Sequence, residues 1–299
     1  MTHGHILFRI GVTALLATLA ACGSQSVKSP GNTRGVPADA LLADALQREP
    51  EKALPLVKEA TEKAPERPDI AWLYSQLCSQ VAGCRPESAE SRLRRLDPGN
   101  AAAWLGALER AREARDVAAE NEVLDAMSRG QRFDIYWNPL VSRIAVAKSS
   151  TPAAQTLPVT DVLTTYLNDT VTWISGTALP SFAPLGDACS TARMGNLATA
   201  ERCRAIADLL MRGDSYIAES VGLGIAERLA RPGSTEAAAV ASQIRRSRYQ
   251  RETAGQVIAA QVEHDKISRE LIELMTQLRR EQDVFLAVIR WSGQPIEPG

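Results

Sequence analysis

The sequence predicts an all-α protein built largely from helix pairs. Alanine, leucine, glutamate and arginine dominate, aromatic residues make up 5% of the chain, and no clear alternating run of six or more residues indicates a strand. Trp72, Trp104 and Trp137 recur 32 and 33 residues apart, each near the start of a helical pattern that follows a turn signal. A period near 34 residues is typical of stacked helix pairs.

The chain begins with a segment that predicts export. Residues 10–21 are mostly apolar, and Arg9 is the only permanent charge before them. Because a membrane-spanning helix needs about 20 apolar residues, this run is too short to cross a bilayer. A weakly basic start, a short apolar middle and small residues at its end are typical of a secretory signal.

The tetrapeptide LAAC, Leu19 to Cys22, resembles the lipobox of bacterial lipoproteins. The resemblance implies that residues 1–21 are removed as a signal peptide and that Cys22 is lipidated, so that its acyl chains anchor the protein to a bilayer. By the same resemblance, Gly23 implies sorting to the outer membrane, with the protein facing the periplasm. A chance cysteine after an ordinary signal is the alternative.

The remaining chain has 299 − 21 = 278 residues, which suits one large or two ordinary domains. Residues 22–37 are rich in Gly, Ser and Pro and predict a flexible tether. We expect a helical-repeat domain over 38–149 and a C-terminal helical domain over 150–299. Loss of Arg9 leaves 34 − 1 = 33 basic against 35 acidic side chains, a balance without the basic footprint of nucleic-acid binding.

Four cysteines remain besides Cys22, and an even number in the oxidising periplasm predicts two disulfides. Among three connectivities we expect the local one, which encloses the shortest loops and contributes roughly 2 to 3 kcal/mol per bridge. It joins Cys78 to Cys84 and Cys189 to Cys203. A metal site is the alternative, but the sequence has no CxxC motif, and His264 is the only histidine left after removal of residues 1–21. A free reactive thiol is a further alternative.

Turn signals divide residues 38–148 into helix pairs. The junction RRLDPGNAAAWLGAL, with Pro98 six residues before Trp104, resembles the repeat boundary of tetratricopeptide proteins. This resemblance implies about three and a half pairs that stack into a curved surface, and such surfaces usually bind proteins or peptides. The helices expected here span 38–48, 51–64, 69–82, 87–96, 101–114, 117–129 and 133–148.

Two positions depart from that family's pattern. Leu108 and Glu120 stand where the family has small residues, with Gly106 and Ala119 nearby but out of register. The repeated tryptophans are expected to fill the space between successive helices, with partner binding as the alternative.

After Ser149 the segment STPAAQTLP marks a boundary, followed by a predicted helix over 159–174. Residues 176–195 lack periodicity and are expected to be a loop stapled by a disulfide to the next helix, 197–211. Phe182 at its tip either contacts a partner or, together with Leu185, covers the end of the helical core.

Gly222 and Gly224 predict a close helix–helix approach, because no strand precedes them and no third glycine completes a phosphate-binding loop. Beyond the turn at 230–234 the pattern is helical to about Trp291, with a break expected near Gly255. A heptad-like apolar stripe, which Glu281 interrupts, predicts docking on the protein's own core rather than a coiled-coil seam. The stripe comprises Ile267, Leu271, Leu274, Leu278, Phe285 and Val288.

The sequence predicts no catalytic residue, no cofactor and no metal site. Nucleophilic hydrolases need a histidine as base, and His264, between two acidic residues, is expected on a helix surface. The sequence leaves open that a pair of carboxylates cleaves glycans.

The expected function is that of a periplasm-facing, lipid-anchored protein–protein interaction scaffold of the cell envelope. The alternative is an immunity-type lipoprotein that inhibits a secreted toxin, and a weaker alternative is a peptidoglycan-acting enzyme. The expected partners are the membrane, through acyl chains on Cys22, and one or more envelope proteins or a toxin, without nucleic acid.

Overall fold

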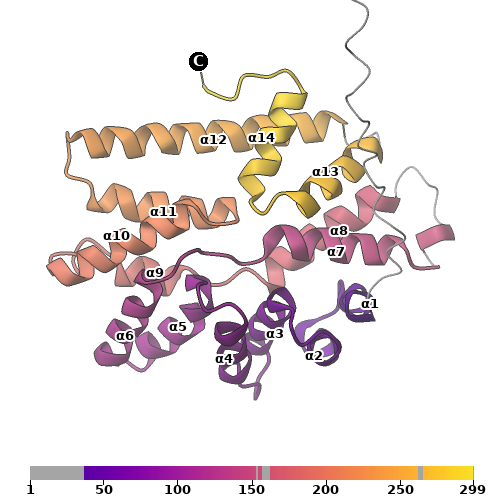
Figure 1. Ribbon diagram of the computed structural model, residues 1–299, viewed down its shortest axis with the longest axis horizontal. Coiled ribbons are helices and arrows are strands. Elements are labelled where there is room, and N and C mark those ends of the chain that lie inside the picture. Colours follow the sequence, from indigo (N-terminus) through magenta and orange to yellow (C-terminus); the bar gives the residue numbers. More distant parts are fainter. Residues whose placement is uncertain (1–36, 153, 157–161, 262–264, 299) are drawn as a thin grey trace, which may run out of the picture. The chain divides into compact units, whose positions relative to one another are not determined.

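The computed structural model is all-α, as the sequence predicts (Figure 1). It describes residues 37–152, 154–156, 162–261 and 265–298. Residues 35–299 form one compact unit. The expected signal peptide, nearly all of the expected tether, Cys22 and His264 lie outside the described residues. Within the described part of the chain, no helix combines the length and the apolar character needed to cross a bilayer.

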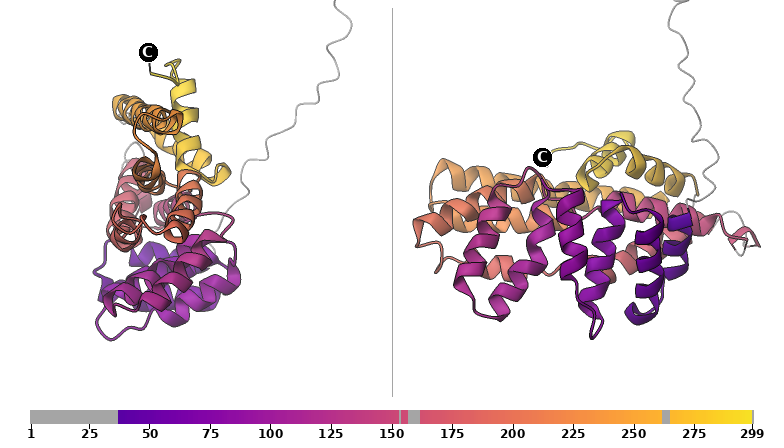
Figure 2. Two further views of the ribbon diagram at one scale, coloured as in Figure 1. Left: turned by 90° about the vertical axis from the view of Figure 1, so that its left-hand side faces the viewer. Right: turned by 60° about the horizontal axis from the view of Figure 1, so that its bottom comes forward.

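The first helices form a row in which each element packs against the next (Figure 2). Three of them begin at a proline, which suits the first helical position because its missing N–H would have no partner there. A 3₁₀ turn, Ala101–Trp104, precedes the fifth helix, and the Asn100 side chain accepts the Ala102 N–H. The row consists of α1 (Pro37–Ala45), α2 (Pro50–Lys63), α3 (Pro68–Gln80), α4 (Glu87–Leu96), α5 (Leu105–Glu113) and α6 (Val117–Ser128).

Two more layers of helices cover one face of this row (Figures 1 and 2). In the second layer α7 packs on α1 and α3, α9 on α5, and α10 on α6; in the third, α12 packs on α11, and α13 on α7 and α8. The second layer holds α7 (Trp137–Ser149), α8 (Val162–Thr177), α9 (Ala183–Ala188), α10 (Leu197–Met211) and α11 (Tyr216–Leu229), with a 3₁₀ turn at Ala154–Thr156. The third layer holds α12 (Thr235–Gln261), α13 (Asp265–Gln277) and α14 (Glu281–Trp291).

A continuous hydrophobic core joins the three layers. It includes fully buried side chains from every layer, and it crosses residue 150 without interruption because α7 packs on both the first helices and α8. Representative members are Leu42, Phe133, Ile174, Leu210 and Val288. Burial of such side chains contributes roughly 1.5 to 3 kcal/mol each.

The repeated tryptophans have different roles in this packing. Trp72 is 1% exposed and donates its indole N–H to the Ala178 carbonyl oxygen at 3.1 Å, so it fills the space between layers. Trp137 is also buried, whereas Trp104 is half-buried beneath the Arg94 guanidinium, 4.5 Å from the ring centroid.

The seventh helix begins later than the sequence predicts. We expected it over 133–148, but α7 starts at Trp137, and residues 133–136 form a connector without helical or strand structure. Tyr136 ends this connector in the left-handed region, at φ 59°. The reason is a set of tertiary contacts, because buried polar groups of Asn100 and Asp214 bind the connector backbone.

Two other expectations are corrected. The segment 176–195 is not wholly a loop, because it contains the six-residue α9. The C-terminal helix does not break at Gly255, which lies inside α12 at an open position where an added Cβ would meet nothing within 4 Å. One glycine costs about 1 kcal/mol in a helix, which a long helix tolerates.

The expected run is instead divided into α12, α13 and α14, and hydrogen bonds tie the turn between α13 and α14 to other segments. The Asn138 side-chain amide donates to the Leu278 carbonyl oxygen at 2.8 Å, and Arg280 donates to that of Gly213 at 3.2 Å. The heptad-like stripe faces the core, since Ile267 and Val288 are buried and the other members pack against it. Docking of these helices is therefore confirmed.

The close approach predicted at the glycine pair holds at one of its two positions. A Cβ built on Gly222 would lie 2.7 Å from Leu210 Cβ and from the Met211 nitrogen, so α10 and α11 touch there. Gly224 has nothing within 4 Å of its Cβ position.

These two glycines form a matched pair for a test of the α10–α11 contact. We expect Gly222→Ala to lower the free energy of unfolding by about 2 kcal/mol or more, because the clash involves backbone atoms. Gly224→Ala should leave it unchanged or raise it by up to about 1 kcal/mol through helix propensity. Urea denaturation of both variants measures the difference; equal effects would contradict the close contact.

Candidate functional site

The four cysteines lie in the local pairs that the sequence predicts. The sulfur atoms of Cys78 and Cys84 are 2.01 Å apart, and those of Cys189 and Cys203 are 1.98 Å apart. The first pair closes the turn after α3. The second ties the turn after α9 to α10, and so fixes the segment that follows α8.

That segment, residues 177–193, which we call the inner strap, lies against the face of the helix row that α3 and α5 present to the second layer. Gln80 donates to the Thr177 carbonyl oxygen at 2.9 Å, beside the Trp72 bond to Ala178. Phe182 stacks on Phe133 with centroids 6.0 Å apart, and Leu185 is fully buried. Phe182 therefore covers the core, and the partner-contact alternative for this side chain is not supported.

Ion pairs hold the far end of the inner strap. The buried Glu120 carboxylate binds Arg193 at 2.6 Å and Arg112 at 3.1 Å, and Arg112 also lies 3.5 Å from Asp187. Glu120 thus links α5 and α6 to the strap. This face of the row is consequently occupied by the chain itself.

The amino-terminal ends of α7, α11 and α14 meet at one place, which we call the three-helix junction. At its centre is Asp214, whose side chain is 0% exposed. Its two carboxylate oxygens accept the backbone N–H groups of Ile135 and Trp137, each at 3.0 Å. An anion at a helix amino terminus is favoured by the helix dipole, so Asp214 caps α7 although it belongs to the segment before α11.

Asn100 binds the same connector from the side of the first layer. Its amide oxygen accepts the Asp134 N–H at 2.9 Å, and its amide N–H donates to the Asp134 carbonyl oxygen at 2.8 Å. The Tyr136 hydroxyl donates to Asp97 at 2.6 Å, and Arg132 also pairs with Asp97. Most of the connector's backbone polar groups are therefore bound without helical structure.

Glu281 repeats the capping arrangement at α11. Its carboxylate accepts the Tyr216 N–H at 2.8 Å, and its own N–H donates to the Asp214 carbonyl oxygen at 2.8 Å. The neighbouring Gln282 donates to the Ser215 carbonyl oxygen at 3.0 Å. The residue that interrupts the apolar stripe is thus a capping group of another helix.

Burial shifts the titration of these carboxyl groups. The pKa of Asp214 is raised, mainly by burial and by the neighbouring Asp134, although the two backbone N–H donors oppose the shift. Burial likewise raises the pKa of Glu281 to about 7, against the lowering effects of the Tyr216 N–H and of Arg251. The pKa of Glu219, on the next turn of α11, is raised by burial as well.

A cavity of about 350 Å³ opens beside this junction, and we call it the end cavity. Its apolar wall consists of Trp137, Leu179 and Ile217, the last of which is 39% exposed. Arg251 and Glu281 supply its charged groups. The other lining residues are Ser215, Tyr216 and Ser220.

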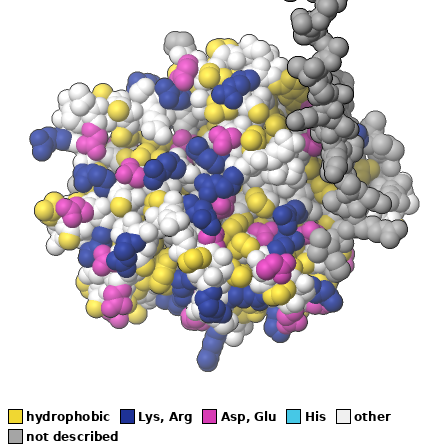
Figure 3. Space-filling model, in the orientation of Figure 1, with side chains coloured by type: hydrophobic (Ala, Val, Ile, Leu, Met, Phe, Trp, Pro, Cys, Tyr) yellow, Lys and Arg dark blue, Asp and Glu magenta, His cyan; other side chains and the backbone are white. Residues whose placement is uncertain are grey.

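A second hollow, of about 260 Å³, continues from the end cavity between α11 and α12. The two share Ser220 and Arg251. Arg248 and Arg251, one helical turn apart, line this α11–α12 groove, and both are exposed. Figure 3 shows Lys and Arg side chains near the middle of the face that carries these helices.

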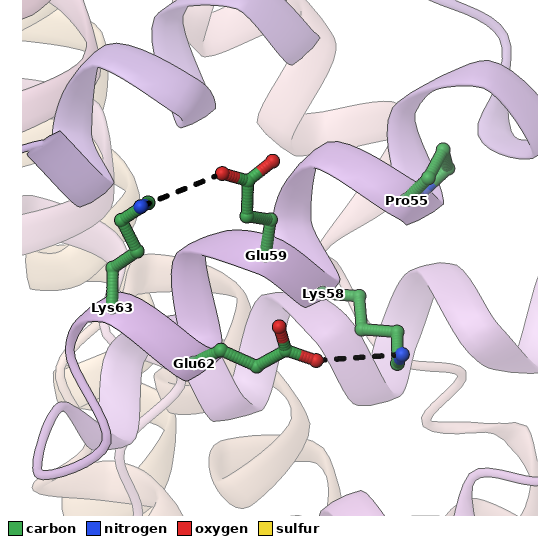
Figure 4. A pocket seen from close by; sticks show the side chains of 5 residues that line it. All are labelled: Pro55, Lys58, Glu59, Glu62 and Lys63. Carbon is green, nitrogen blue, oxygen red and sulfur yellow. Dashed lines mark ion pairs between the residues drawn. The ribbon is translucent and has the colours of Figure 1, made fainter.

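A larger hollow, of about 690 Å³, lies over α2 and has a different character (Figure 4). Its lining comes from one helix, and its charged groups pair with each other: Lys58 with Glu62 at 3.4 Å and Lys63 with Glu59 at 3.7 Å. Such exposed pairs contribute little energy. Because its charges are already paired, we place the candidate site at the end cavity and the α11–α12 groove.

The sequence matches no protein family model, and no curated protein and no solved structure is similar to it. Among the described residues, no three histidine, cysteine or acidic side chains are grouped as ligands for a metal ion.

The sequence reasoning missed Asp214, Glu281 and Arg251. Glu281 gave a signal, since an acidic residue stood where the stripe required an apolar one. Asp214 and Arg251 gave no such signal in the sequence, because the residues they contact are distant along the chain.

The raised pKa of Glu281 predicts a pH dependence of stability. Because its folded-state pKa lies above its ordinary value of 4.5, the folded protein holds the proton more tightly, and stability falls as pH rises through the range from about 4.5 to 7. Glu281→Gln keeps an acceptor for the Tyr216 N–H but does not ionise. Between pH 5 and pH 8 the variant should therefore gain about 1 to 2 kcal/mol relative to the wild type.

Denaturant unfolding at several pH values measures this gain. The control is Glu252→Gln, which alters an exposed carboxylate on α12 and should follow the wild-type curve. Parallel curves for the wild type and Glu281→Gln would contradict the assignment.

Proposed function

We propose that the protein is a lipid-anchored interaction scaffold of the bacterial cell envelope, held on the membrane through Cys22 and facing the periplasm. The observation that carries the proposal is the row of helix pairs α1–α6, which has an outer face in solvent and an inner face fixed on further helices. Rows of this kind present broad, rigid surfaces, which usually bind proteins.

Rigidity supports a binding role in two ways. The two cysteine pairs fix one turn within the first layer and one within the second, and the ion pair between Glu120 and Arg193 joins these two layers. The inner strap is already in place, so a partner need not order it on binding. A surface that is ordered before association loses less conformational entropy when the complex forms.

The lipid anchor is supported by the sequence at LAAC. We expect Cys22→Ala to release the full-length protein from the membrane fraction into the soluble periplasm, because three acyl chains supply the membrane affinity. Immunoblotting of fractionated cells measures this release, with Cys78→Ala/Cys84→Ala as a cysteine control that stays on the membrane. Membrane retention of the Cys22→Ala protein would contradict the anchor.

The binding role is tested by cross-linking the tagged, lipidated protein in intact cells and identifying what it captures. A scaffold should capture several envelope components reproducibly. Capture of a single enzyme at very high affinity would favour the immunity-type alternative. If the protein captures no partner but shortens the glycan strands of purified peptidoglycan, both binding proposals are wrong. The protein is then a peptidoglycan-acting enzyme.

A further inference from the structure

We propose that the α11–α12 groove and the end cavity together bind an extended acidic segment of a protein partner, with one apolar side chain of that segment in the end cavity. This inference rests on the proposed binding function and names the surface and the chemistry of the partner.

The first argument is that the inner face of the helix row is closed to a partner. The inner strap lies on it, held by Trp72, Gln80 and the ion pairs of Glu120. A peptide could enter only by displacing a segment that the Cys189–Cys203 pair holds at one end. The α11–α12 groove carries no such occupant among the described residues.

The second argument is charge. Arg248 and Arg251 are exposed and form no ion pair with any described residue. Guanidinium groups bind carboxylates through paired hydrogen bonds, and two of them on successive turns match two acidic side chains of an extended segment. Helical rise places their backbones about 4.5 Å apart along α12.

The acidic groups of the groove limit where those carboxylates can lie. Glu281 stands in the end cavity, but its carboxylate is already bound by the Tyr216 N–H. Glu227 is exposed at the opposite end of the groove, beyond Arg248. The expected order along the partner is therefore an apolar residue, then two acidic residues, with a neutral or basic residue near Glu227.

The third argument is that α12 already binds a segment of this chemistry, namely the chain's own carboxyl-terminal residues. Glu297 pairs with Arg246 at 2.7 Å. Tyr249 donates to the Pro295 carbonyl oxygen and Gln250 to that of Ile296, each at 3.0 Å. The neighbouring face of α12 thus holds an apolar–acidic pair, Ile296 and Glu297, through an arginine and through side-chain bonds to the backbone of that segment.

The test uses the full-length lipidated protein in cells, with photoreactive p-benzoylphenylalanine in place of Ile217 at the rim of the end cavity. We expect one discrete cross-linked product, and mass spectrometry should find two acidic residues beside the cross-linked apolar residue. Arg248→Glu/Arg251→Glu should reduce the yield about tenfold.

The matched control is Arg245→Glu/Arg228→Glu, which reverses two exposed charges on the same helices outside the groove and should leave the yield unchanged. Circular dichroism melts of both double variants establish that they fold.

The inference is overturned if residue 217 yields no product, if the product persists in Arg248→Glu/Arg251→Glu, or if the captured molecule is a lipid or a segment without acidic residues. The same photoreactive residue in place of Val117, which is 60% exposed at the start of α6, tests the scaffold function separately from the groove. If a protein is captured at residue 117 and none at residue 217, the proposed scaffold function stands and the proposed binding site in the groove is wrong.

Discussion

The buried carboxylate of Asp214 is the interaction on which the three-layer arrangement depends. It lies before α11, yet it accepts the N–H groups that begin α7, and its own carbonyl oxygen accepts the N–H that begins α14. Intramolecular hydrogen bonds contribute about 0.5 to 1.5 kcal/mol each, and leaving a buried N–H group without an acceptor costs about 1 to 3 kcal/mol. The Asp214 side chain therefore fixes where α7 starts, and its backbone carbonyl oxygen binds the start of α14, so one residue directly before α11 joins the beginnings of three helices.

The same junction explains why the candidate site has its shape. The end cavity opens at this junction, where Trp137, Ile217 and Glu281 from the first turns of α7, α11 and α14 line it. The groups that cap helices, Asp214 and Glu281, have raised pKa values because they are buried, whereas Arg248 and Arg251 of α12 are exposed and form no ion pair with a described residue. The structural and the binding roles thus fall on different residues of one region.

The sequence predicts the helical class, most helix positions and both cysteine pairs, because these depend on local pattern and short loops. It fails where distant polar groups decide the backbone: the connector at 133–136 was expected to be helical, but Asn100 and Asp214 bind its backbone in a non-helical conformation. It also misplaces the break at Gly255, since the turn at 278–280 is fixed by Asn138 and Gly213. The pocket residues escape prediction for the same reason, as they come from five separate segments of the chain.

Native-state hydrogen exchange of the Ile135 and Trp137 amides tests the role of Asp214 most directly. Both N–H groups should exchange only through global unfolding, with the same protection as the Ile144 amide inside α7, because Asp214 binds them in the core. Exchange of these two amides within minutes at pH 7, while Ile144 stays protected, would contradict the account. The layers would then be joined by apolar packing alone.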